Sequence, residues 1–132
     1  MPAASIQIPG LVVNAGDTVT ATITKSTGSL WNLVLNDNTT GGHFAITLSY
    51  ASSMSSAEWI QEDPSYTSSS LVPLDIFGTV AFSGVSTTFN GSLSNLLTSY
   101  ASKVTLVSAS GVTIATTSSI GGGGTSFSVT HQ

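Results

Sequence analysis

Apolar and polar side chains alternate along most of this chain. Alternation with a period of two is typical of a strand that turns one side to a core and the other to water. It recurs in eight short segments: Ile6 to Ile8, 19–23, 31–35, 44–48, 80–82, 104–106, 112–114 and 127–129. Turn residues separate these segments at 14–17, 36–38, 41–42, 90–91, 110–111 and 121–124. Short strands at this spacing predict an antiparallel β-sandwich.

Two stretches depart from the alternation. Four apolar residues lie at i, i+3, i+4 and i+7 behind the potential N-cap Ser92, namely Leu93, Leu96, Leu97 and Tyr100. This spacing predicts one short helix from about Leu93 to Ser102. The hydroxyl-rich residues 65–70 predict a loop that borders a cleft. The predicted fold class is therefore all-β, an antiparallel β-sandwich with one short helix, and 132 residues with 40% apolar content predict a single domain over 1–132.

The chain carries very little charge. Charged residues make up 6% of the sequence, and Lys25 and Lys103 are the only cationic side chains besides the histidines. No basic surface can therefore form for nucleic acid or an anionic membrane, and no apolar run reaches membrane-spanning length. About a third of the residues are Ser or Thr, which predicts a hydroxyl-rich surface and secretion. With a net charge of −4 and few ionisable groups, the protein should tolerate acid.

Several kinds of chemistry have no support in the sequence. The absence of Cys excludes a thiol nucleophile, and His43 and His131 have no further ligands at metal-binding spacing. No serine-nucleophile motif occurs, and Gly121 to Gly124 are not followed by the Lys-Ser/Thr of a phosphate loop. We therefore expect neither a metal nor an organic cofactor.

Glu58 is the leading candidate for catalysis. It directly precedes Trp59, and a carboxylate beside a large apolar ring resists desolvation unless the fold pairs or uses it. In a strand over 57–62, alternation would place Glu58, Ile60 and Glu62 on one face. Glu58 would then act as a general acid or base on a concave sheet face. The alternative is an edge strand whose charges deter aggregation.

The sequence around Glu58 resembles a known motif. Residues 57–62, Ala-Glu-Trp-Ile-Gln-Glu, are similar to the A-E-W-I-x-E strand of the glutamic peptidases (eqolisins), which are acid endopeptidases. Further segments resemble motifs of that family in the same order: 10–21, 31–41, 77–82, 104–107 and 126–130. The resemblance implies a β-sandwich that hydrolyses peptide bonds in acid without a cofactor, and it places the family's catalytic Glu at Glu58.

The resemblance is incomplete at the second catalytic position. The family pairs its Glu with a Gln that lies upstream of the region where this chain begins, and Gln7, Gln61 and Gln132 do not match that motif. The resemblance therefore implies the larger C-terminal part of a peptidase domain. We expect such an incomplete domain to form a homodimer or to pair with the missing N-terminal segment.

The sequence is compatible with three functions. The first is an acid endopeptidase that acts on peptides or unfolded proteins, with Glu58 as general acid and base and with substrate contacts from Trp59, Tyr66 and Glu62. For these contacts the plainer alternatives are that Trp59 is a core residue and that Glu62 is a solvated strand end. The second function is a non-catalytic binding or self-association module derived from the same family. The third is an unrelated surface-layer or adhesin module, which would explain the Ser and Thr content but not the ordered motifs.

Overall fold

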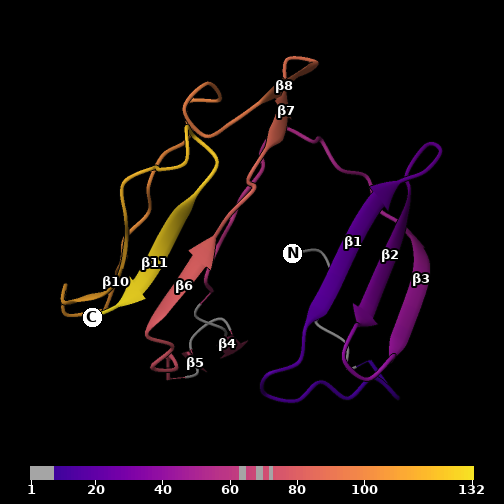
Figure 1. Ribbon diagram of the computed structural model, residues 1–132, viewed down its shortest axis with the longest axis horizontal. Coiled ribbons are helices and arrows are strands. Elements are labelled where there is room, and N and C mark those ends of the chain that lie inside the picture. The colour runs from indigo at the N-terminus through magenta and orange to yellow at the C-terminus, as the bar shows by residue number, and fades with distance from the viewer. Residues whose placement is uncertain (1–7, 63–64, 68–69, 72) are drawn as a thin grey trace. The chain divides into compact units, whose positions relative to one another are not determined.

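The computed structural model describes residues 8–62, 65–67, 70–71 and 73–132, and in this part of the chain all regular structure is β-structure (Figure 1). The predicted all-β, antiparallel class is confirmed. None of the described residues belongs to a helix long and apolar enough to cross a membrane. The chain divides into two compact units, Met1–Ser55 and Ser56–Gln132.

The first unit is a three-stranded antiparallel sheet in the order β1-β2-β3 (Figure 1). The strands are β1 (Val19–Lys25), β2 (Leu30–Asp37) and β3 (His43–Ser49). Ile23 lies opposite Leu33, which in turn lies opposite Ile46. Residues that face each other across a ladder share one side of the sheet, so the apolar members of all three strands line the same side. The alternation in these three segments therefore predicted both the strands and their common apolar face.

The second unit is built around a four-stranded antiparallel sheet in the order β6-β11-β10-β9. Its strands are β6 (Thr79–Phe82), β9 (Leu106–Val107), β10 (Thr113–Thr117) and β11 (Phe127–His131). Phe82 lies opposite Phe127, and the two rings stack with their centroids 4.5 Å apart. Aromatic pairs of this kind add about 0.5–1.5 kcal/mol beyond the burial of their area. The pair thus joins the edge strand β6 to the sheet.

Two small hairpins complete the second unit. One pairs β4 (Ser65–Thr67) with β5 (Ser70–Leu71), so the predicted loop over 65–70 contains short strands. The other pairs β7 (Thr87–Phe89) with β8 (Ser92–Ser94) around the turn residues Asn90 and Gly91. Both turn residues have positive φ angles, 49° and 78°, as a two-residue hairpin turn that matches the strand twist requires.

The helix predicted from Leu93 to Ser102 is wrong. Leu93 pairs with Thr88 in the β7–β8 hairpin, and turns follow it up to Tyr100. The side chains of Leu93 and Tyr100 are 82% and 83% exposed, while Leu96 is buried, so the helical spacing does not mark a buried face. Tyr100 also has a φ angle of 59°, which a right-handed helix does not allow. Ladder pairing across the Asn-Gly turn overrides the local helical preference.

Asn95 organises the turns that replace the helix. Its Oδ1 accepts hydrogen bonds from the amides of Leu97 and Thr98, both at 3.0 Å, and its Nδ2 donates to the carbonyl of Gly123 at 3.1 Å. The amide of Leu96 donates to the carbonyl of Gly124. One side chain therefore shapes its own turn and fixes it to the glycine-rich turn before β11.

Candidate active site

The candidate residue Glu58 lies in the segment 50–62, which forms neither helix nor strand. The expected strand over 57–62 is absent because no described residue pairs with this segment in a ladder. Exposure nevertheless alternates along it: Trp59 and Gln61 are half-buried, whereas Glu58, Ile60 and Glu62 are exposed. The expected alternation is thus present over 58–62 only, since Ala57, expected on the face of Trp59 and Gln61, is exposed as well.

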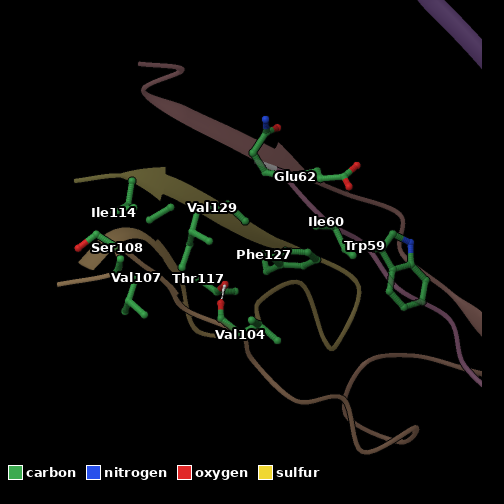
Figure 2. A pocket seen from close by; sticks show the side chains of 14 residues that line it. Trp59, Ile60, Glu62, Val104, Val107, Ser108, Ile114, Thr117, Phe127 and Val129 are labelled. Atoms are coloured by element: carbon green, nitrogen blue, oxygen red, sulfur yellow. Dashed lines mark hydrogen bonds between the residues drawn. The ribbon is translucent and has the colours of Figure 1, made fainter. Parts of the chain in front are cut away.

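The cavity of the second unit begins at the residue after Glu58. It has a volume of about 350 Å³, and Trp59, Ile60, Gln61 and Glu62 form one wall. Figure 2 shows Trp59, Ile60 and Glu62 on one side of the cavity and Val104, Val107 and Ile114 on another. Glu58 itself is not among the residues that line the cavity.

The opposite wall is formed by the sheet and the segment that leads into β9. Phe127 and Val129 alternate along β11, and Thr117 lies opposite Val129, so these three side chains share one face. A register shift lies between Thr113 and Ala115 of β10, and both Ile114 and Ala115 line the cavity there. Such an irregularity bends a strand and re-aims its side chains.

A hydrogen bond joins two of the residues that line the cavity, Thr117 and Val104. The Thr117 hydroxyl donates to the carbonyl of Val104 at 2.9 Å (Figure 2). The contact joins β10 to a stretch that makes no ladder of its own. Since Val104 and Leu106 both line the cavity, this bond fixes part of its surface.

The arrangement is chemically simple. An exposed carboxylate such as Glu58 stays in contact with water and can exchange protons with it. The cavity beside it is mainly apolar and has the size of a site for one or two large side chains. Within the described ranges, no three His, Asp or Glu side chains group as a metal ion would require.

The other residues expected at the site have different outcomes. Trp59 and Glu62 both line the cavity, while the side chain of Tyr66 lies outside the described part of the structure. Gln7 is also outside it. Gln61 lines the cavity, and Gln132 is engaged elsewhere, because its Nε2 donates to the Thr116 hydroxyl at 3.0 Å.

Sequence reasoning did not find the far wall of the cavity. The alternation at 112–114 and 127–129 predicted strands there, but it did not indicate which strands face the Glu58 segment. The few polar residues of the mainly apolar lining are distant from one another in sequence, Gln61, Ser108 and Thr117 among them. No local sequence pattern indicates that these residues lie together.

A β-rich chain with an exposed carboxylate next to an apolar cavity is compatible with several classes of hydrolase and of binding protein. Comparison with known proteins identifies the family. Residues 1–131 match the Peptidase A4 family, and the chain belongs to this family, the glutamic peptidases. The resemblance inferred from the sequence motifs is thereby confirmed.

A solved structure agrees with this assignment. The chain is similar to the crystal structure of aspergilloglutamic peptidase from Aspergillus niger, with a TM-score of 0.76 and 26% sequence identity. The match covers 99% of this chain and 75% of that chain. It confirms the predicted β-sandwich class. Among curated proteins, no sequence matches the chain significantly.

Proposed function

We propose that this protein takes part in hydrolysing peptide bonds in acid, with Glu58 as the proton-transfer group. Ionised Glu58 removes a proton from water as the water oxygen attacks the peptide carbonyl, and it returns that proton to the leaving nitrogen. The observation that carries this proposal is the family match over 1–131, within which Glu58 directly precedes the cavity wall.

The reaction also needs a donor for the oxyanion that forms on the carbonyl. A glutamine amide suits this task because its NH2 donates without titrating, whereas a second carboxylate would repel the first or share its proton. We assign this role to a glutamine outside the 132 residues, since none of Gln7, Gln61 and Gln132 matches the motif that carries the glutamine in the family it resembles. Loss of such a donor costs about 10²- to 10³-fold in rate, so the chain alone should be nearly inactive.

The proposed substrates are peptides and unfolded proteins, held by the cavity next to Glu58. Trp59 offers an indole surface for an apolar substrate side chain, and Glu62 offers a carboxylate that can accept a hydrogen bond from a substrate amide. Tyr66 is proposed as a further contact. We place this activity outside the cell in an acidic medium, in keeping with the hydroxyl-rich, charge-poor composition.

The test is digestion of an unfolded protein at about pH 4, by the chain alone and with a peptide that supplies the family's upstream Gln segment. We expect cleavage mainly in the mixture, and a loss of about 10³-fold or more in Glu58→Gln. Asp75→Asn is the matched control, because it removes another exposed carboxylate of the second unit that does not line the cavity, and it should keep most of the activity. Cleavage that survives in Glu58→Gln would rule out the proposed role.

A second candidate function is a non-catalytic binding module. The open apolar cavity favours it, because a cavity of this kind can hold a peptide side chain without any proton transfer. Calorimetric titration with an apolar peptide separates the two functions. Equal affinity of the native chain and Glu58→Gln, without cleavage in any mixture, would favour the binding module.

The proposed assembly can be measured in the same preparations. Pairing with an upstream segment, or formation of a homodimer, would cover edge strands and apolar sheet faces. Analytical ultracentrifugation of the chain, alone and with the segment, reports which of the two forms. A stably folded monomer that ignores the segment would contradict both, together with the view of 1–132 as one incomplete domain.

A further inference from the structure

The turn between β2 and β3 is built around a buried carboxylate. Asp37 ends β2 and keeps only 1% of its surface exposed. Its Oδ1 accepts the amides of Thr39 at 2.8 Å and Thr40 at 3.0 Å, and its Oδ2 accepts the Thr40 hydroxyl at 2.7 Å. A carboxylate that accepts several hydrogen bonds is held in its ionised form, since protonation removes acceptor capacity.

The same turn holds the start of β1. The amide of Thr18 donates to the Thr39 hydroxyl oxygen at 2.9 Å, and the amide of Asn38 donates to the carbonyl of Thr18 at 2.8 Å. The side-chain amide of Asn38 donates to the Thr20 hydroxyl at 2.7 Å. Asp37 orients Thr39, and Thr39 in turn holds Thr18. The carboxylate therefore supports, through Thr39, a contact with Thr18 that it does not make itself.

Among the described residues of the first unit, no cation compensates this buried charge. Lys25 lies at the other end of β1, opposite Trp31. His43 bonds Asn36 through Nδ1 at 2.7 Å, and alternation places that pair on the opposite side of the sheet from Asp37. The remaining titratable neighbour is Asp17, which directly precedes Thr18 and accepts a hydrogen bond from the amide of Asn14 at 2.7 Å.

Neutral donors therefore set the acidity of this group. The Thr40 hydroxyl and then its amide lower the pKa of Asp37 below its ordinary value, with a smaller contribution from the Thr39 amide. Desolvation by burial acts in the opposite direction. A lowered pKa means that the hydrogen-bonded, ionised turn persists at pH values where a free aspartate is already half protonated.

We propose that Asp37, Thr39 and Thr40 form an acid-resistant latch, which keeps the β2–β3 turn and the start of β1 joined in moderate acid and opens when Asp37 takes up a proton. The opening is local: a proton on Asp37 turns one of its oxygens into a donor, so the carboxyl can no longer accept all three hydrogen bonds, and the turn that orients Thr39 toward Thr18 loosens. The latch is independent of the catalytic proposal. Its consequence is that the first unit stays closed in the acidic range and loosens only below it.

Hydrogen exchange of individual amides tests the latch in the intact chain. We expect the amides of Thr18, Thr39 and Thr40 to keep their protection, after correction for intrinsic exchange rates, down to a pH below about 3.9. They should then lose it together, with the same midpoint as the carboxyl carbon resonance of Asp37. Amides in the middle of the ladder, such as those of Leu33 and Val34, should stay protected at that pH.

Two substitutions of Thr40 supply matched variants. Thr40→Val removes the shortest donor but keeps the side-chain shape, so the opening midpoint should move to a higher pH by about one unit. Thr40→Ser keeps the hydroxyl and should restore the native midpoint. Asp37→Asn, if it folds, should expose the three amides at every pH.

Three results would overturn the proposal. The first is loss of protection that coincides with unfolding of the whole chain. The second is a Thr40→Val midpoint equal to that of the native protein. The third is an Asp37 resonance that titrates at or above the ordinary value of an aspartate.

Discussion

At the residue scale, Gly124 is a position where the surroundings leave no room for a side chain. Its φ angle is 102°, it is buried, and a Cβ there would lie 2.6 Å from the side chain of Asn95. Asn95 cannot move away without breaking its bonds to the amides of Leu97 and Thr98. Backbone strain and the clash therefore add, and we expect Gly124→Ala to lower the free energy of unfolding by about 2–4 kcal/mol.

Gly123 provides the control for this prediction. It also has a positive φ angle, 67°, but a Cβ there would meet nothing within 4 Å. Gly123→Ala should therefore cost about 1–2 kcal/mol, from backbone strain alone. Denaturant unfolding of both variants measures the difference. Equal costs would show that Asn95 does not constrain this turn.

At the element scale, the β7–β8 hairpin depends on its turn more than on its strands. Each strand has three residues, and Phe89 and Leu93 are exposed, so packing contributes little. Gly91 holds a φ angle of 78°, which a residue with a Cβ adopts at a cost. We expect Gly91→Ala to lower the free energy of unfolding by about 1 kcal/mol and to weaken the hairpin amide protection. Ser92→Ala, on an exposed position one residue further, should change it by less than about 0.5 kcal/mol.

The strands could be predicted from the sequence where alternation was long. Around Ile23, Leu33 and Ile46, each segment carries three alternating apolar residues, and the structure has a strand at each. The hairpin around Asn90 was identified only as a turn, because Leu93 fits a helical spacing as well as a strand. A local pattern cannot decide between them when the ladder partner, Thr88, has no apolar alternation of its own.

The sequence predicted only the part of the candidate site that has a local signature. The Glu58 segment has a local signature, an acid next to Trp59 in a chain with few charges. The far wall at Ile114 and Val129 depends on which strands of the sheet face that segment. This is a property of the tertiary fold, which single-sequence periodicity does not contain.

At the scale of the whole molecule, the scarcity of charge governs the response to pH and salt. Six acidic side chains and two lysines make the net charge −4 near neutrality. Protonation of the carboxylates in acid leaves only a few positive charges, so little repulsion builds up between like charges. Because few charged side chains interact, screening by salt should also change the stability very little. Hydroxyl groups, which do not titrate in this range, keep the surface hydrated.

The stability of the chain should therefore depend weakly on pH until Asp37 titrates. Because the pKa of Asp37 is lowered in the folded state, its contribution is fully present above about pH 4, the unfolded value, and is lost as pH falls through the folded value. We expect the Tm to change by less than about 5 °C between pH 7 and pH 4, at both about 0.05 and about 0.5 M salt, and to fall more steeply below. In Asp37→Asn, the Tm between pH 7 and pH 4 should be lower than in the native chain. The fall in Tm below pH 4 should be smaller than in the native chain. A Tm that declines steadily from neutral pH, or that depends strongly on salt, would show that surface charge pairs rather than the buried aspartate control the acid response.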